Sequence, residues 1–180
     1  ENSQALDQYF RAANYLTVAQ IFLKDNFLLE RPLTFDDIKP RLLGHWGSGP
    51  GVNFAYMHLS QLSKKTNQQI MFVLGPGHAF PSLQANLFLE GTLEQFYPQA
   101  QRNLDGIAHI CQNFSWPYGY PSHSNPGTPG VILEGGELGY SLSTSYGAAL
   151  DNPDLMVATL VGDGEAETGP TAAAWHINKL

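Results

Sequence analysis

The sequence predicts an α/β domain with a mostly parallel sheet flanked by helices. Two short apolar runs, 69–74 and 155–161, are rich in β-branched or large apolar residues and are typical of buried strands. Segments with apolar residues three or four positions apart surround these runs and indicate helices. Each run also leads into a glycine-rich loop, and open α/β sheets bind ligands at the carboxyl ends of such strands.

The helices are predicted from apolar spacing and from the residues that cap or end them. We expect Thr34 and Ser82 to be N-caps, and Pro40 to end the short helix after Thr34. The predicted helices cover 3–24, a few residues after Thr34, 55–65, 82–96, 135–150 and the segment from Pro170 onward, with a weak helical pattern at 101–111. Residues 42–51 and 114–134 are predicted loops, and so long an ordered loop as the second is usually functional.

The length and charge of the chain exclude several classes of protein. The 180 residues suffice for one domain with a real core, and we see no repeat or linker. The formal net charge of −7 argues against a nucleic-acid-binding protein. Only 14% of the residues are charged, where about a quarter is usual, so we expect other protein surface to cover part of this one.

The sequence contains no targeting or membrane segment. No apolar stretch reaches the length of a transmembrane helix, and the polar start does not resemble a signal peptide. Cys111 is the only cysteine, which excludes an intrachain disulfide and fits a reducing compartment, so we expect a cytoplasmic protein. The chain lacks an initiator Met and stops within a helical pattern, so we expect a piece of a longer protein.

An acidic glycine loop follows the second predicted strand. Gly162 and Gly164 flank Asp163, and glycine lets a backbone bend sharply and approach a ligand. Free N–H groups in such a loop can hold a phosphate, while the Asp can hold a hard cation that shares it. A tight turn with a solvated Asp gives the same three residues, and the tripeptide alone leaves both interpretations open.

Three of the six histidines lie on loops bent by glycine or proline: His45, His78 and His123. Histidine exchanges protons near neutral pH, so three of them beside a phosphate-type loop indicate a shared polar pocket. Each one alone could instead be exposed or bonded to backbone. The other three fall in helical patterns and are expected to pack or to lie at the surface: His58, His109 and His176. A zinc site and a serine-hydrolase triad are poorly supported, because paired ligands and a Gly-x-Ser-x-Gly segment are missing.

Four glutamates lie in two of the glycine loops, and their simplest role is to cap the helices that begin there, as we expect of Glu137. They are Glu134, Glu137, Glu165 and Glu167.

Five motifs follow one another along the chain. They are Gly-His-Trp-Gly-Ser-Gly-Pro-Gly (44–51), Gly-Pro-Gly-His (75–78), Pro-Ser-His (121–123), Glu-Gly-Gly-Glu-Leu-Gly-Tyr-Ser-Leu (134–142) and Gly-Asp-Gly-Glu-Ala-Glu-Thr-Gly-Pro (162–170). In this order they resemble the amino-terminal part of phosphoketolase, the thiamine diphosphate enzyme that cleaves xylulose 5-phosphate or fructose 6-phosphate with inorganic phosphate. The resemblance covers nearly the whole chain, and the three His loops separate it from the related transketolase.

The resemblance implies that residues 1–180 are the amino-terminal part of the diphosphate-binding domain of a transketolase-like fold. Asp163 would be a ligand of Mg²⁺, and the backbone of Gly164 and Glu165 would touch the diphosphate of the cofactor. Gly136 and the adjacent Glu137 would contact the cofactor where the predicted helix 135–150 begins, as the physics of helix termini allows.

The three loop histidines would line the pocket around the thiazolium and the sugar, with His45 and His123 in contact with the cofactor. Phosphoketolase chemistry dehydrates a thiamine diphosphate enamine to acetyl-thiamine diphosphate, and phosphate then releases acetyl phosphate. Removing a sugar hydroxyl proton needs a base, and expelling hydroxide needs an acid. Our hypothesis is that His78 and His123 hold the substrate hydroxyl and assist dehydration, and that His45 is a further proton donor.

Other parts of the family's site are not found in this sequence. The Asn that completes the Mg²⁺ site lies roughly thirty residues beyond the Gly-Asp-Gly in the family, and Asn178 is too close to Asp163 to take that role. The family's activating Glu comes across a dimer interface, and its sugar-phosphate ligands come from later domains. The resemblance therefore implies a homodimer or larger assembly, and we expect residues 1–180 alone to be inactive.

Two other functions remain open at this point. A transketolase-type enzyme would use the same acidic loop to transfer the two-carbon unit to an aldehyde. A non-catalytic paralogue would bind the cofactor without turnover. The products formed from fructose 6-phosphate and phosphate distinguish these possibilities.

Overall fold

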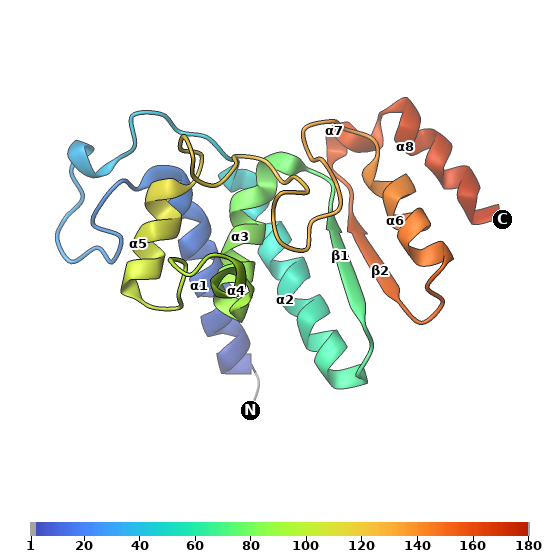
Figure 1. Cartoon of the computed structure of the whole chain (residues 1–180), viewed down its shortest axis with the longest axis horizontal. Helices are drawn as coiled ribbons and strands as arrows, with labels where there is room; N and C mark the ends of the chain where they lie inside the picture. The colour runs from blue at the N-terminus through green and yellow to red at the C-terminus, as the bar shows by residue number, and fades with distance from the viewer. Residues whose placement is uncertain (1–2, 180) are drawn as a thin grey trace. The chain divides into compact units, whose positions relative to one another are not determined.

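The computed structural model describes residues 3–179, which form two compact units (Figure 1). The first unit comprises residues 3–54 and 79–123, and the second comprises residues 55–78 and 124–179. The chain passes between the units three times: within the helix Gly49–Thr66, within the short 3₁₀ helix Gly77–Ala79, and after residue 123.

The first unit is helical. Its elements are α1 (Ser3–Phe22), the short 3₁₀ helices η1 (Phe35–Asp37) and η2 (Trp46–Ser48), the start of α2 (Gly49–Thr66), α3 (Phe80–Glu90), α4 (Thr92–Phe96) and α5 (Leu104–Asn113). Helix α1 packs against α3 and α5. Helix α3 is buried along nine consecutive residues, so it forms the centre of this unit. The helical pattern at 101–111 is confirmed as α5, which Asn103 caps by accepting a hydrogen bond from the Gly106 N–H at 2.9 Å.

Three predictions about helix boundaries are wrong here. The predicted helix 82–96 is interrupted because Gly91 adopts a left-handed φ of 87°, which ends α3 and starts α4. Ser82 is not an N-cap, since Ala79 occupies that position and Ser82 is buried inside α3. The predicted helix 55–65 begins earlier, at Gly49, because Pro50 suits the first turn of a helix.

A chain of buried amides joins three helices of the first unit. Asn53 donates from Nδ2 to Asn14 Oδ1 at 2.9 Å and to Thr17 Oγ1 at 3.1 Å. Asn86 in turn donates to Asn53 Oδ1 at 2.8 Å, and its own Oδ1 accepts from the Tyr9 hydroxyl at 2.8 Å. Buried polar groups need such partners, so this network fixes how α1, α2 and α3 pack.

A closed surface loop, residues 24–39, follows α1. Its two ends are tied by hydrogen bonds from Lys24 N to Asp37 O at 2.7 Å and from Lys39 N to Phe22 O at 2.9 Å. The Asp37 carboxylate is buried and accepts two hydrogen bonds from the Arg31 guanidinium, at 2.7 and 2.5 Å, and one from Thr34 N at 2.8 Å. The loop is thus ordered, although its Phe35 side chain is 97% exposed.

Acidification is expected to loosen this loop. The hydrogen-bonded Arg31 guanidinium, helped by the Thr34 N–H, holds the pKa of Asp37 well below its usual range. A depressed folded-state pKa means that Asp37 stabilises the fold above the unfolded pKa of about 3.9, and that this stabilisation declines as the pH falls below it. We expect the protection of residues 24–39 against hydrogen exchange, measured relative to the intrinsic exchange rate at each pH, to fall below about pH 4.

The substitution Asp37→Asn should reduce the protection of residues 24–39 against hydrogen exchange already at neutral pH. The control is Asp36→Asn, because Asp36 is the exposed neighbour of Asp37. Equal exchange in the two variants at pH 7 would contradict the role of the Arg31–Asp37 pair.

The second unit contains the sheet. Strands β1 (Ile70–Leu74) and β2 (Met156–Leu160) pair in parallel, with Ile70 opposite Met156 and Leu74 opposite Leu160. The other elements of this unit are the second part of α2, η3 (Gly77–Ala79, which ends in the first unit), α6 (Ser141–Leu150), α7 (Asp163–Ala166), α8 (Gly169–Ala174) and η4 (Trp175–Lys179). Helix α6 packs against both strands, and the Tyr56 ring of α2 meets the Phe72 ring of β1 edge to face.

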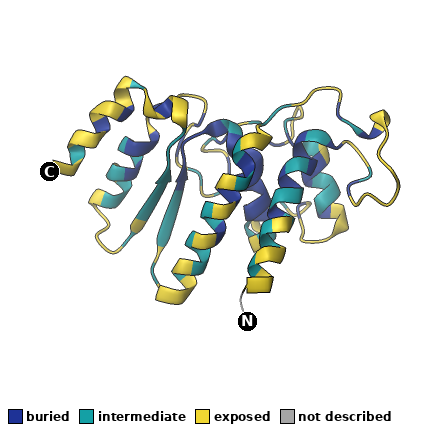
Figure 2. Cartoon of the chain, turned by 180° about the vertical axis from the view of Figure 1, so that it is seen from behind, coloured by how far each residue is buried: buried dark blue, intermediate teal, exposed yellow. Residues whose placement is uncertain are grey.

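The predicted α/β class with parallel strands and flanking helices is confirmed. In the described residues the sheet has two strands, and most residues of both are partly exposed (Figure 2). The predicted helix 135–150 is shorter than expected and begins at Ser141, whereas the helix predicted from Pro170 is confirmed as α8, with Thr168 as its cap. The short helix α7 was not predicted.

Candidate functional site

Three glycine-rich loops meet at one edge of the sheet in the second unit. We call residues 75–78, 134–141 and 162–165 the glycine-loop cluster. Because β1 and β2 are parallel, their carboxyl ends lie together, and Gly75 N donates to Leu160 O at 2.9 Å. The sequence prediction that the Gly-Pro-Gly-His and Gly-Asp-Gly loops each follow a strand of a parallel sheet is confirmed, and the structure shows that the two strands are neighbours.

The loops touch through their backbones. A Cβ atom on Gly77 would lie 2.2 Å from the Gly135 carbonyl oxygen, and one on Gly75 would lie 2.1 Å from a carboxylate oxygen of Glu165. Neither position has room for a side chain. Ser124 adds a link, since its N–H donates to Gly77 O at 3.2 Å and its carbonyl accepts from Gly135 N at 2.8 Å.

Glu165 is buried at the centre of the cluster, with 2% of its surface exposed. Its Oε1 atom accepts from Gly139 N at 3.2 Å, from Ser141 N at 3.2 Å and from Ser141 Oγ at 2.6 Å. Its Oε2 atom accepts from Gly162 N at 3.3 Å. The expectation that a glutamate caps a helix here is confirmed, because Glu165 is the third residue of α7 and bonds the N–H of its N-cap.

Asp163 and Gly164 open helix α7 and are exposed. The first bond of this turn runs from Ala166 N to Gly162 O at 2.8 Å, so the helix supplies no acceptor to the N–H groups of residues 163–165. A Cβ on Gly164 would meet only Leu138 Cδ1, at 4.0 Å. The fold itself therefore does not require glycine at position 164, and the space beside it is open.

Gly136 and Glu137 do not begin a helix, which corrects the sequence prediction. Both are exposed in the loop before α6, and Tyr140 is the N-cap of that helix. The reason is Gly139, whose φ of 109° lies outside any helical conformation. The Gly136 N–H donates to Glu134 Oε1 at 2.9 Å, so this glutamate closes a local turn.

The three loop histidines lie in different places. His78 is half-buried in η3 and belongs to the glycine-loop cluster. His45 and His123 are exposed in the first unit. His45 caps η2 by accepting from Ser48 N at 3.0 Å through Nδ1, and His123 Nδ1 shares a 3.0 Å hydrogen bond with Ser122 Oγ. The proposed roles of these side chains remain predictions.

Among residues 3–179, no three His, Cys, Asp or Glu side chains come together as metal ligands. Asp163 therefore stands as a single candidate ligand for Mg²⁺ in this part of the chain. Its exposed carboxylate and the adjacent N–H groups nevertheless suit a cation that bridges to a phosphate, since hard cations take carboxylate and phosphate oxygens. The residues present fit one side of a cation–diphosphate site.

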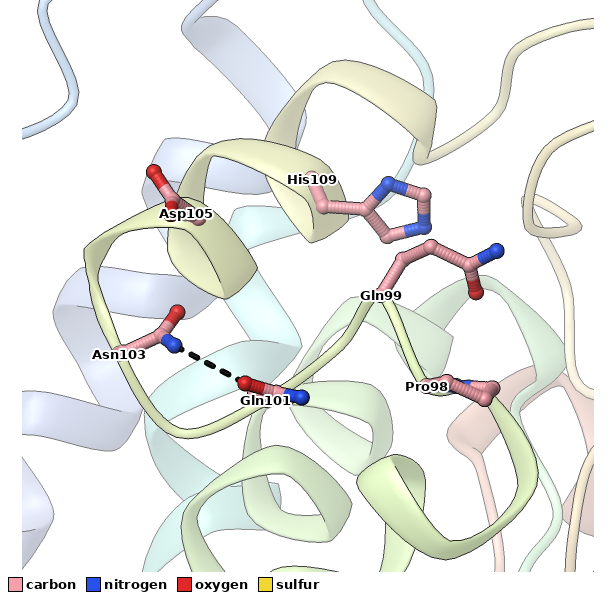
Figure 3. A pocket seen from close by; sticks show the side chains of 6 residues that line it. All are labelled: Pro98, Gln99, Gln101, Asn103, Asp105 and His109. Carbon is pink, nitrogen blue, oxygen red and sulfur yellow. Dashed lines mark hydrogen bonds between the residues drawn. The ribbon is translucent and has the colours of Figure 1, made fainter.

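A polar hollow of about 350 Å³ lies in the first unit and contains none of the predicted site residues. It lies beside α5 and is open to solvent (Figure 3). Its lining residues are Pro98, Gln99, Gln101, Asn103, Asp105 and His109. Burial lowers the pKa of His109, whose ring packs edge to face on Tyr120, as expected for a packing residue. The Asn103 amide donates to Gln101 across the hollow at 3.2 Å.

No helix among the described residues has the length and apolar character needed to cross a membrane.

Comparisons with known proteins agree with the sequence motifs. The family model of the XFP N-terminal domain matches residues 1–180. The chain is 58% identical over 180 residues to a protein of Pseudomonas putida named probable phosphoketolase, covering 100% of this chain and 23% of that protein. Proteins of the same name from Rhodopseudomonas palustris strain HaA2 and Bradyrhizobium diazoefficiens are 57% identical over 177 residues and 58% identical over 175 residues. These alignments cover 98% and 97% of this chain, and 23% and 22% of the relatives. The chain thus spans about a quarter of the length of these relatives.

Proposed function

Because this chain belongs to the XFP N-terminal domain family, we propose that it forms the diphosphate-binding part of a thiamine diphosphate-dependent phosphoketolase. The full-length protein would cleave xylulose 5-phosphate or fructose 6-phosphate with inorganic phosphate. The products would be acetyl phosphate and glyceraldehyde 3-phosphate or erythrose 4-phosphate. The domain would belong to the transketolase-like fold of thiamine diphosphate enzymes.

The meeting of three glycine loops at the carboxyl edge of a parallel sheet is the observation that carries this proposal. Such an edge is where open α/β sheets hold phosphate ligands. Within the cluster, Asp163 is exposed while Glu165 is buried, so the acidic loop presents one carboxylate outward and anchors itself with the other. A turn with a merely solvated Asp would not need the second carboxylate.

The residues of the acidic loop would hold the diphosphate end of the cofactor. Asp163 would bind Mg²⁺, and the N–H groups of Gly164 and Glu165 have no acceptor within α7, so they suit diphosphate oxygens. Gly136 and Glu137 would approach from the loop before α6. When bound, thiamine diphosphate would supply the carbanion-stabilising thiazolium.

The loop histidines would move protons at the sugar. His78, within the cluster, and His123 would hold a substrate hydroxyl, take its proton and return one to the departing hydroxide. His45 would act as a further donor. In this structure His45 Nδ1 accepts from Ser48 N, so the proton of the neutral ring is on Nε2.

Turnover by the purified full-length protein tests the proposal. We expect acetyl phosphate from fructose 6-phosphate or xylulose 5-phosphate only when phosphate, Mg²⁺ and thiamine diphosphate are all present, detected as the hydroxamate. Transfer of the two-carbon unit to an aldehyde without phosphate dependence would indicate the transketolase-type alternative. Binding of the cofactor without either product would indicate a non-catalytic protein. The assembly is expected to be a dimer or larger, and the location cytoplasmic.

Removing the histidines separately should reduce turnover. We expect His78→Ala and His123→Ala to lower acetyl phosphate formation by about 10²- to 10⁴-fold, the usual contribution of general acid–base catalysis. His58→Ala is the matched control, because His58 is exposed on α2 outside the glycine loops. Unchanged acetyl phosphate formation in the His78 and His123 variants would disprove their assignment.

A further inference from the structure

We infer that the side chain of Glu165 is a positioning residue, which holds the acidic loop in the shape that presents Asp163 and the Gly164 N–H to a diphosphate. This inference rests on the proposed function and deepens it. The sequence resemblance concerned only the backbone of residue 165, whereas the structure gives the carboxylate a separate task.

The carboxylate connects the loop after β2 to the loop before α6. Three of its four hydrogen bonds come from Gly139 and Ser141, and the fourth comes from Gly162, directly before Asp163. One backbone donor, Ser141 N, is at the first position of α6, another, Gly139 N, directly precedes its N-cap, and a third is the N-cap N–H of α7. A carboxylate is favourable at both helix amino termini, so one side chain stabilises two helix starts together.

Because Glu165 is a buried carboxylate, both loops must stay in place to satisfy it with hydrogen bonds. A buried carboxylate is costly unless hydrogen bonds replace its water. No Lys or Arg within residues 3–179 forms an ion pair with it, so N–H and O–H groups provide the compensation. Displacing either loop would leave part of the carboxylate unsatisfied. The absence of a side chain at Gly75 gives Oε2 its space, since a Cβ there would lie 2.1 Å away.

The substitution Glu165→Gln isolates this role. Glutamine has the same shape but offers one oxygen, so an NH₂ group must face either Gly162 N–H or the donors at Gly139 and Ser141. If the oxygen keeps the three donors, the substitution breaks the hydrogen bond from the Gly162 N–H, which lies next to Asp163. Loss of the charge-assisted hydrogen bonds to the Glu165 carboxylate should make the acidic loop more mobile, while the apolar core stays intact.

The experiment uses the full-length protein in two states. Without ligand, hydrogen exchange of the peptides that contain residues 139–142 and 162–165 should be about tenfold faster in Glu165→Gln than in the wild type. With saturating Mg²⁺, calorimetry should show thiamine diphosphate binding weakened by about 10- to 100-fold. Once the cofactor is saturating, the KM for the sugar phosphate should stay within about twofold, because the substrate end of the site is unchanged.

Two further variants make the result specific. Glu167→Gln removes the same charge from an exposed residue of the same loop and should change neither exchange nor cofactor affinity. Ser141→Ala removes the hydroxyl that donates to Glu165 at 2.6 Å but leaves the carboxylate, so it should change exchange and cofactor affinity less than Glu165→Gln does. If Glu165→Gln does not fold, Ser141→Ala tests the inference in its place. In the double variant, Ser141→Ala should add little to the effects of Glu165→Gln on exchange and affinity, because both substitutions act on one hydrogen-bond network.

Wild-type exchange and wild-type cofactor affinity in folded Glu165→Gln would overturn the inference. Faster exchange with unchanged affinity would also overturn it, because the loop would then be held without benefit to the ligand. If the wild-type protein itself binds no thiamine diphosphate, the proposed function fails. The exchange data would then still decide whether Glu165 holds the two loops together.

Discussion

Replacing Asp163 with Asn is expected to reduce Mg²⁺-dependent binding of thiamine diphosphate to the full-length protein by at least about 100-fold. Asp163 is exposed at the first position of α7, so its carboxylate is available to a cation. Asparagine keeps the size of the side chain but lacks the charge, and hard cations depend on ligand charge for their affinity. Titration calorimetry with and without a chelator measures the effect. The variant with Mg²⁺ should resemble the chelated wild type.

A matched control is Asp154→Asn, which removes the same charge just before β2, at the opposite end of that strand from Asp163. Its cofactor affinity should equal that of the wild type. Asp163→Asn should also keep the thermal midpoint of the ligand-free protein within a few degrees, because an exposed first-turn Asp stabilises a helix by only about 0.3–1 kcal/mol. An affinity within threefold of the wild type would refute a Mg²⁺ role for Asp163.

Adding a single methyl group at Gly75 is expected to be strongly destabilising. The new Cβ of Gly75→Ala would lie 2.1 Å from Glu165 Oε2, 2.7 Å from the Leu160 carbonyl oxygen and 2.9 Å from Ser141 Oγ. The Leu160 carbonyl belongs to β2 and cannot move without disturbing the strand pairing. Overpacking typically costs about 1–3 kcal/mol, and we expect a loss of about 3 kcal/mol here. Thermal or denaturant unfolding of the full-length protein measures it.

The same substitution at Gly147 should have the opposite sign. Gly147 lies within α6 and a Cβ there would meet nothing within 4 Å. Since alanine is the better helix former, Gly147→Ala should stabilise by about 1 kcal/mol. A Gly75→Ala protein as stable as the wild type would show that β2 and the Glu165 carboxylate can move aside. It would also weaken the view that this part of the cluster is rigid.

Much of the second unit follows from local sequence. The apolar runs that form β1 and β2 are short, contain β-branched or large apolar residues and are bounded by turn residues. Such strands can be predicted from the local sequence alone. Their parallel pairing followed from the helices between them. The exposed Asp163 and the loop position of His78 could likewise be predicted, because glycine and proline mark bends in the chain.

The missed features depend on contacts between distant segments. The apolar pattern predicts a continuous helix over 135–150, whereas Gly139 has a left-handed φ where its N–H donates to Glu165, 26 positions away. The burial of Glu165 itself could not be seen, because a glutamate in a polar loop has the same sequence signature whether it faces solvent or the interior. The buried amides around Asn53 were hidden for the same reason, as their partners lie 33 to 39 positions away.

The closed loop 24–39 has a consequence for how this family can vary. Its ends are joined by backbone hydrogen bonds between Phe22, Lys24, Asp37 and Lys39, and Phe27 is anchored by a hydrogen bond from the Tyr15 hydroxyl of α1 to its carbonyl. Loops closed in this way tolerate insertions and deletions, since lengthening a loop adds little entropic cost. Relatives should therefore differ in length between residues 28 and 30, which are exposed, while keeping the Arg31–Asp37 type of pairing at the base.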